Sequence, residues 1–269
     1  METKAVLTLA NIHKTFHPGT NNENHVLKGI NFILEAGEFV TVIGGNGAGK
    51  STLLNTIAGT IFPDEGSIIL ADCDVTKYNV RKRSKYIGRV FQDPRMGTAT
   101  RLTIEENLAL AVKRNKPKGL GRGVSAKDRL LFEEKLAMLG LNLETKLQAE
   151  IGLLSGGQRQ AITLLMATLI TPKILLLDEH TAALDPKTSA AVLKITEELI
   201  TSKQLTTLMI THNMEDAIRY GTRLIMLNAG KIVVDVKGVE KQNLTVTALM
   251  NLFHQNSGTA LQDDTLLLG

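Results

Sequence analysis

Two glycines separated by four residues and followed by lysine and serine occupy positions 44–51 of this 269-residue chain. They lie between a β-branched run, 38–43, and a segment of helical character, 51–58. A strand, a glycine-rich turn and a helix in this order favour phosphate binding, because backbone N–H groups and the positive end of the helix converge on an anion. The sequence therefore predicts a nucleotide site made of Gly44, Gly45, Asn46, Gly47, Ala48, Gly49, Lys50, Ser51 and Thr52.

A nucleotide site also needs acidic residues to bind Mg²⁺ and to activate water. Asp178 and Glu179 supply them after the apolar run 174–177. In a parallel sheet, ligands bind beyond the carboxyl ends of the strands. Asp178 is therefore expected to hold Mg²⁺ together with the Ser51 hydroxyl, and Glu179 to polarise a water beside the γ-phosphate. An acidic pair after a strand can also be a helix N-cap, but the phosphate loop favours the catalytic interpretation.

The rest of the chain alternates between buried-strand and helical patterns. Apolar runs at 173–177, 206–210 and 223–227 are separated by helical segments at 189–202 and 214–220. This alternation predicts a parallel sheet covered by helices. Three other regions carry different expectations: an antiparallel start at 6–12 and 26–34, separated by a polar loop at 17–24; a hairpin strand at 231–236 after Asn228, Ala229 and Gly230; and a last helix at 245–254.

The segment 94–170 shows no clear strand pattern. Helical stretches at 104–114 and 125–139 are joined by a basic, glycine-rich loop at 115–123. We expect an inserted helical subdomain here.

Composition narrows the class of protein. The net charge of +4 from 31 basic and 27 acidic residues permits an anionic ligand but does not require nucleic acid, and 4% aromatic content without tryptophan argues against base-stacking surfaces. No apolar run approaches the ~18 residues of a membrane span, and no secretory signal pattern opens the chain. The single cysteine, Cys73, cannot form an internal disulfide, so we expect a reducing, cytoplasmic environment.

The segment 154–160 (Leu-Ser-Gly-Gly-Gln-Arg-Gln), shortly before Asp178, resembles the signature motif of ATP-binding cassette (ABC) ATPases. Ser155 is a plausible N-cap, and the apolar helix behind it, 161–170, directs a positive end at an anion. In that family the signature covers the ATP held by a partner subunit. The resemblance therefore implies a head-to-tail dimer in which Ser155, Gly156, Gly157 and Gln158 contact the partner's nucleotide.

Four further residues match positions of the family. Gln92 resembles the Q-loop glutamine that contacts Mg²⁺ and the attacking water, and His212 resembles the switch histidine that holds the γ-phosphate. Asp185 resembles the D-loop aspartate at the dimer interface, and Phe16 resembles the aromatic residue that stacks on adenine. An Asp-Pro turn and a core position are the simpler interpretations of Asp185 and Phe16.

One position departs from the family. His180 follows the acidic pair, where the family usually has proline. It is either a titratable group beside the site or a helix-start residue without functional effect.

The resemblance covers about 7–236 and implies an α/β fold: a P-loop NTPase (RecA-like) core with an antiparallel β subdomain and an inserted α-helical subdomain. It implies an ABC ATPase domain at 1–236, with the helical subdomain at about 94–170, and a C-terminal helix and tail at 237–269. The implied function is hydrolysis of Mg·ATP, with Glu179, His212 and Gln92 catalytic, to power a transporter at the cytoplasmic face of the cell membrane.

Implied partners are a second ATPase subunit, for which an identical chain suffices, and transmembrane permease subunits docked near Gln92 and 96–106. The sequence around Ser155 looks most like bacterial importers of small solutes such as amino acids. An importer would add an extracytoplasmic solute-binding protein.

Two alternatives stay open. An exporter with separate permease subunits has the same parts. A soluble ABC ATPase acting on nucleic acid or ribosomes would use the basic stretches 81–85 and 113–118. Because solvated or lipid-facing surfaces explain these stretches more simply, no specific nucleic-acid partner is expected.

Overall fold

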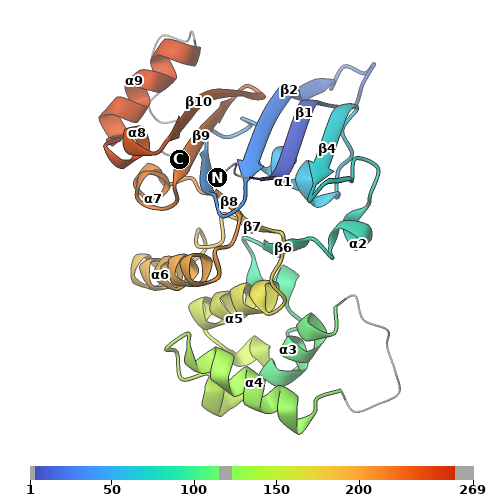
Figure 1. The fold of residues 1–269 in the computed structure, drawn as a ribbon, viewed down its shortest axis with the longest axis vertical. Coiled ribbons are helices and arrows are strands. Elements are labelled where there is room, and N and C mark those ends of the chain that lie inside the picture. The colour runs from blue at the N-terminus through green and yellow to red at the C-terminus, as the bar shows by residue number, and fades with distance from the viewer. Residues whose placement is uncertain (1–3, 115–122, 258–269) are drawn as a thin grey trace.

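The computed structural model describes residues 4–114 and 123–257, and the account below concerns those residues. Two sheets and their helices make up the described chain (Figure 1). The smaller sheet has the order β2-β1-β4-β5 and contains β1 (Ala5–Phe16), β2 (Asn24–Glu35), β4 (Glu65–Leu70) and β5 (Cys73–Asp74). The larger has the order β10-β9-β3-β8-β7-β6 and contains β3 (Phe39–Ile43), β6 (Ile87–Val90), β7 (Ile174–Asp178), β8 (Thr207–Ile210), β9 (Arg223–Asn228) and β10 (Lys231–Lys237).

The helices complete this α/β arrangement. In chain order they are α1 (Lys50–Ala58), α2 (Val80–Arg83), α3 (Ile104–Val112), α4 (Ala126–Ala137), α5 (Gly156–Thr168), α6 (Pro186–Lys203), α7 (Met214–Arg219), α8 (Val239–Gln242) and α9 (Val246–Ser257). Short 3-10 turns lie at Pro94–Gly97, Glu144–Lys146 and Ile151–Leu153. In the described ranges, no helix is long and apolar enough to cross a membrane.

Several expectations from the sequence are confirmed. β1 and β2 pair antiparallel, β9, β3, β8, β7 and β6 run parallel, and β10 returns antiparallel to β9 as a hairpin. The segment 94–170 contains α3, α4 and α5, with a single isolated strand pair, Thr103–Glu150, in its described part. The expected loop at 115–123 lies outside the described residues except for Gly123, and so does the tail beyond 257.

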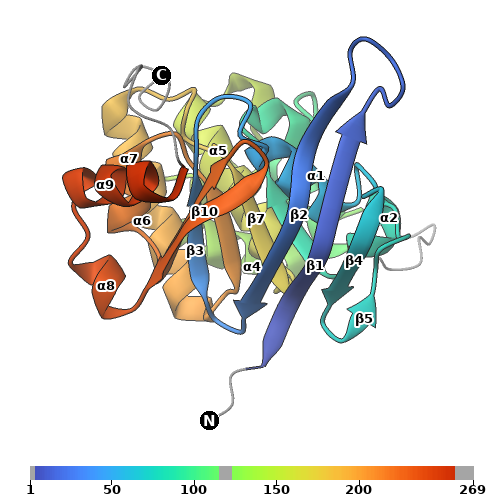
Figure 2. The same ribbon diagram turned by 90° about the horizontal axis from the view of Figure 1, so that it is seen from above.

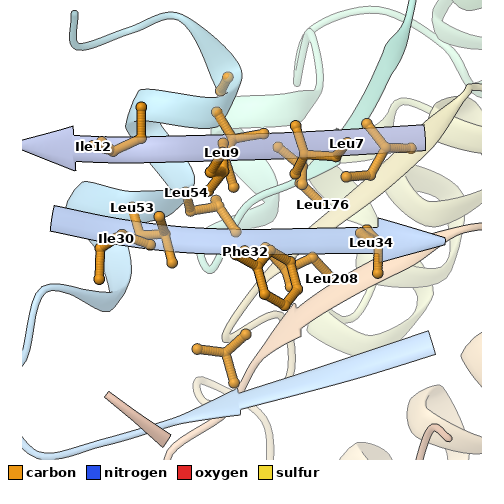
Figure 3. Close-up of a cluster of buried hydrophobic side chains, with 14 of the residues drawn as sticks. Leu7, Leu9, Ile12, Ile30, Phe32, Leu34, Leu53, Leu54, Leu176 and Leu208 are labelled. Carbon is orange, nitrogen blue, oxygen red and sulfur yellow. The ribbon is translucent and has the colours of Figure 1, made fainter. Parts of the chain in front are cut away.

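Side chains on the two faces of the central strands belong to two different hydrophobic clusters. Side chains in a strand point alternately to the two faces of the sheet. Ile174 and Leu176 of β7 therefore join a cluster that also contains α1 and the smaller sheet, whereas Leu175 and Leu177 join the cluster containing α3, α4 and α5. Figure 3 shows the first cluster, with Leu53 and Leu54 of α1 among side chains of β1 and β2. Helix α1 is thus anchored to both sheets.

A third cluster joins α7, α9 and Leu244, which follows α8, to the hairpin β9–β10. Figure 2 shows these helices beside β10. Lys241, at the end of α8, is buried and donates hydrogen bonds from Nζ to the carbonyls of Ile218, Tyr220 and Gly221 at 2.9, 2.6 and 2.9 Å. The chain after β10 is therefore attached to the carboxyl end of α7.

Three strands escaped the sequence analysis: β4, β5 and β6. β5 has only two residues, Cys73 and Asp74, which are too few to form a recognisable pattern. β6 has apolar residues at Ile87 and Val90 but glycine and arginine between them, so its pattern is too short and too polar to indicate a buried strand. β4 contains Gly66 as its second residue, and its apolar part is limited to the last three residues. Hydrogen-bonded pairing with a longer strand, β1 for β4 and β7 for β6, stabilises the extended conformation that their own residue patterns do not indicate.

Arg83 has a structural role that its basic surroundings concealed. Its side chain is fully buried, and its guanidinium donates to the carbonyls of Tyr78, Thr76, Thr56 and Ile57 at 2.6–3.0 Å. Burial lowers the pKa of Arg83 to about 10, so the group stays charged at neutral pH. The last two carbonyls belong to the final turn of α1, where a cation also opposes the negative end of the helix. Arg83 is not available to bind phosphates.

Replacing this guanidinium should destabilise the whole chain. Arg83→Met leaves four carbonyls, two of them in buried hydrogen bonds, without the guanidinium donor, and we expect the free energy of unfolding to fall by about 3 kcal/mol. Urea unfolding followed by circular dichroism measures the change. Arg81→Met, which removes an exposed charge two residues earlier, is the matched control and should cost less than about 0.5 kcal/mol. Equal effects of the two substitutions would contradict this role.

Candidate functional site

Neighbouring parallel strands bring most of the predicted site residues to one edge of the larger sheet. Gly44 follows β3, His212 follows β8, Glu179 follows β7 and Gln92 follows β6. These four strands are adjacent in the order β3-β8-β7-β6, and the last residue of β7, Asp178, pairs with Ile210 at the end of β8. Because the strands are parallel, their carboxyl ends meet along this edge.

The loop between β3 and α1 is built for close backbone approach. A Cβ on Gly44 would lie 2.3 Å from the carbonyl oxygen of Leu227, and Gly49 has a φ of 104°, so both positions require glycine. Around Gly47, by contrast, no atom lies within 4 Å of where a Cβ would stand. Helix α1 begins at Lys50 without a side-chain cap. The loop therefore has an open side and a helix end whose N–H groups suit an anion.

Lys50 lies over this loop. Its Nζ donates to the carbonyls of Gly44 and Gly45 at 2.6 and 3.2 Å, and the residue is only 8% exposed. Burial lowers the pKa of Lys50, while the negative charge of Glu179 acts in the opposite direction. The charge of Glu179, at the end of β7, thus acts on the ammonium of Lys50. Ser51, the next residue in the chain, is exposed.

The acidic pair has two different environments. Asp178 Oδ2 accepts a hydrogen bond from Arg89 Nη2 at 2.9 Å, and both side chains are mostly buried. Glu179 takes a left-handed backbone conformation with φ of 45°, and its N–H donates to the carbonyl of Ile210 at 3.1 Å. Asp178, Arg89 and Gln92 line one cavity of about 700 Å³. Oxygen donors on Asp178, Gln92 and Ser51 are of the kind that Mg²⁺ prefers.

Arg89 is the residue of this site that sequence reasoning missed. The pattern at Ile87–Val90 did not predict a strand, and Arg89 takes its partner from the neighbouring strand β7, so the local sequence carried no signal for its role.

The motif at 154–160 forms a second group. Ser155 caps α5, with its Oγ accepting from the N–H of Gln158 and the Gln158 side chain accepting from the N–H of Ser155, both at 3.3 Å. A Cβ on Gly157 would lie 2.2 Å from Cγ2 of Thr188, so glycine is required for α5 to approach α6. Asp185 caps α6 by accepting from the N–H of Thr188 at 3.1 Å, and hydrogen bonding with Thr188 lowers its pKa. The signature-like motif and Asp185 are therefore side by side.

Two single residues complete the set. Phe16 ends β1, is half-buried rather than part of the core, and has Lys14 Nζ 5.8 Å from its ring centroid. The neighbouring strand β2 reaches the phosphate loop, since the Val26 carbonyl oxygen would lie 3.1 Å from a Cβ on Gly49. His212 is exposed immediately before the N-cap of α7.

His180 is neither at a helix start nor able to titrate near neutrality. Helix α6 begins only at Pro186, and His180 is 2% exposed in the preceding turn. Its Nε2 lies 3.0 Å from Thr196 Oγ1, which itself donates to the carbonyl of Val192 at 2.8 Å. His180 is therefore the donor. Burial lowers its pKa to about 4. The histidine ties the turn after Glu179 to α6, and the two interpretations of its sequence position were both wrong.

This burial makes stability depend on pH. The unfolded chain binds a proton at His180 near pH 6.5 and the folded chain only near pH 4, so acid favours unfolding. As the pH falls from 6.5 towards 4, the histidine should cost up to about 3 kcal/mol of unfolding free energy. His180→Gln should remove that slope in urea unfolding between pH 7 and pH 5. The exposed His17, changed to Asn, is the control and should leave the slope intact. A slope unchanged in His180→Gln would contradict the assignment.

Comparison with known proteins gives consistent matches. A family model described as "ABC transporter" matches residues 27–182. The tyrosine transport ATP-binding protein of Clostridioides difficile is 44% identical over 248 residues, which cover 92% of this chain and 98% of that protein. The phosphonates import ATP-binding protein of Treponema denticola is 36% identical, covering 86% of this chain and 89% of that protein.

Solved structures agree with these matches. A dimeric ATP-binding cassette bound to ADP and Pi in a post-hydrolysis state is similar with a TM-score of 0.73 and 30% identity, covering 86% of this chain and 98% of that one. The ADP conformation of a cassette from an ABC transporter gives a TM-score of 0.77 at 26% identity, covering 93% and 99%.

Proposed function

The chain belongs to the ABC transporter family, and from that membership we propose that it is the ATP-hydrolysing subunit of an importer for an amino acid such as tyrosine. The ATPase role follows from the family. The observation that carries the solute is the 44% identity to a tyrosine transport ATP-binding protein across nearly the whole of both chains. Exporters and soluble ABC proteins are not favoured, since the named relatives are transport or import subunits and Arg83, central to one basic stretch, is buried.

The proposed ATP site combines both groups of residues. The loop 44–52 would hold the phosphates, Phe16 would stack on adenine, and Ser51, Gln92 and Asp178 would hold Mg²⁺. The uncapped start of α1, the buried ammonium of Lys50 and the oxygen donors at the sheet edge support this assignment. When bound, Mg²⁺ neutralises charge on the phosphates.

The chain's own residues then have separate tasks. Glu179 would accept a proton from the attacking water, since it follows the strand next to the phosphate loop's helix and its charge acts on Lys50. Gln92 and His212 would orient the water and the γ-phosphate, respectively. Lys50 would stabilise the charge that develops on the phosphate oxygens.

The second group of residues, 155–158 with Asp185, has the features expected of a surface that contacts the nucleotide of a partner subunit. Residues 155–158 start helix α5 with a Ser155–Gln158 capping box, and Asp185 lies beside them against α6. We propose that they cover the ATP of a second copy in a head-to-tail dimer, as the family resemblance implies. A nucleotide gripped by two subunits binds the closed dimer better than the open monomers, which is the differential affinity needed to drive movement.

The domain bounds and the partner subunits are also proposed from the resemblance to the family. Residues 1–236 would form the ATPase domain, with 94–170 as its helical insertion and 237–269 as a C-terminal extension. Membrane permease subunits would dock near Gln92 and 96–106 at the cytoplasmic face, where Met96 exposes 70% of its surface. An extracytoplasmic solute-binding protein would deliver the solute.

Removing the proposed base should separate binding from turnover. Glu179→Gln keeps the shape of the side chain but cannot take a proton, so kcat for ATP should fall by about 10²-fold or more while the Kd for ATP changes little. Phosphate release and binding of a fluorescent ATP analogue measure the two quantities. Glu197→Gln, an exposed acid on α6, is the control and should retain kcat.

The same variant tests transport. Cells of the native host that carry Glu179→Gln in place of the wild-type chain should lose energy-dependent uptake of labelled tyrosine. Normal turnover by the purified variant would reject Glu179 as the base. Lost turnover with unaffected tyrosine uptake would instead reject the proposed solute.

A further inference from the structure

Arg89 places a positive charge directly on the proposed magnesium ligand. It is the one charged residue of β6, on the strand adjacent to β7, and its Nη2 donates to Asp178 Oδ2 at 2.9 Å. The side chains of Arg89 and Asp178 are 14% and 17% exposed. Water screens such a pair weakly, so the interaction is stronger than that of a surface ion pair.

Two further observations describe the surroundings of the Arg89 guanidinium. Its Cζ lies 4.6 Å from the centroid of the Phe91 ring, next to Gln92. Its Nε is buried without a hydrogen-bond partner. The guanidinium therefore depends on Asp178 and on the face of Phe91 at this position. A cation that approached Asp178 would meet a positive group already in contact with the carboxylate.

Repulsion between two cations at one carboxylate makes them competitors. We propose that Arg89 is an internal counter-ion of Asp178: it neutralises this carboxylate when no nucleotide is bound, and its competition raises the Mg²⁺ concentration that nucleotide binding requires. The inference rests on the proposed role of Asp178 as a magnesium ligand. It extends that role by naming the residue that sets the metal dependence of the site.

The test is a Mg²⁺ titration of nucleotide binding by the full-length chain. A fluorescent, non-hydrolysable ATP analogue is held at fixed concentration, and its binding is followed as Mg²⁺ increases. Arg89→Met removes the competing charge but keeps a long apolar side chain against Phe91. The half-saturating Mg²⁺ concentration should fall about tenfold, which is the effect of losing one charge-assisted hydrogen bond.

Arg95→Met is the matched control. Arg95 is an exposed arginine, 70% accessible, that pairs with Asp93 on the segment after Gln92. Its loss changes the net charge by the same amount without touching Asp178. A half-saturating Mg²⁺ concentration in Arg89→Met that matches Arg95→Met, or that rises, overturns the proposal.

Asp178→Asn tests the proposed role of Asp178 as a magnesium ligand separately from the role of Arg89 as its counter-ion. If Asp178 is a ligand, Asp178→Asn raises the required Mg²⁺ concentration, and adding Arg89→Met to it has no further effect. An unchanged Mg²⁺ requirement in Asp178→Asn rejects the proposed ligand itself. A raised requirement in Asp178→Asn, combined with no effect of Arg89→Met on the wild-type background, rejects the counter-ion alone.

A second variant covers the case in which Arg89→Met does not fold. Arg89→Lys retains the charge but loses the planar contact with Phe91 and the fork geometry, so it weakens the ion pair. It should lower the half-saturating Mg²⁺ concentration by about two- to threefold, less than the methionine substitution. No change in this variant contradicts the proposal.

Discussion

The junction between β3 and α1 is the constraint on which the rest of the structure depends. Gly44 passes so close to the Leu227 carbonyl that a Cβ would lie 2.3 Å from it, and Leu53 and Leu54 of α1 pack between the two sheets. The loop cannot move without disturbing both the neighbouring strand and the larger core. The open side of the loop and the uncapped end of α1 are therefore held rigidly where an anion can bind.

The sheet order determines which chemistry surrounds that anion. Because β8, β7 and β6 run parallel beside β3, they bring His212, the acidic pair and Gln92 to the same edge. The pairing of α5 with α6 gathers the other half of the proposed machinery, Ser155 to Gln158 with Asp185. One chain thus carries both halves of the proposed nucleotide site, and two copies of the chain would make each proposed site whole.

Motifs and strong patterns could be predicted from the sequence, and contacts between distant segments could not. The parallel sheet, the hairpin after Asn228 and the helices of 94–170 follow from hydrophobic patterns that each segment carries itself. The sequence analysis placed Arg83 in a solvated basic stretch, because no neighbouring residue indicates that the end of α1 packs against its side chain. Arg89 and His180 likewise take their partners, Asp178 and Thr196, from other elements.

The central claim is that ATP joins two copies of the chain. Sedimentation of the Glu179→Gln variant, which should retain ATP without cleaving it, tests this claim most directly. The account predicts a monomer without nucleotide or with ADP, and a dimer with Mg·ATP. A chain that stays monomeric with Mg·ATP, even in complex with its membrane subunits, would contradict it.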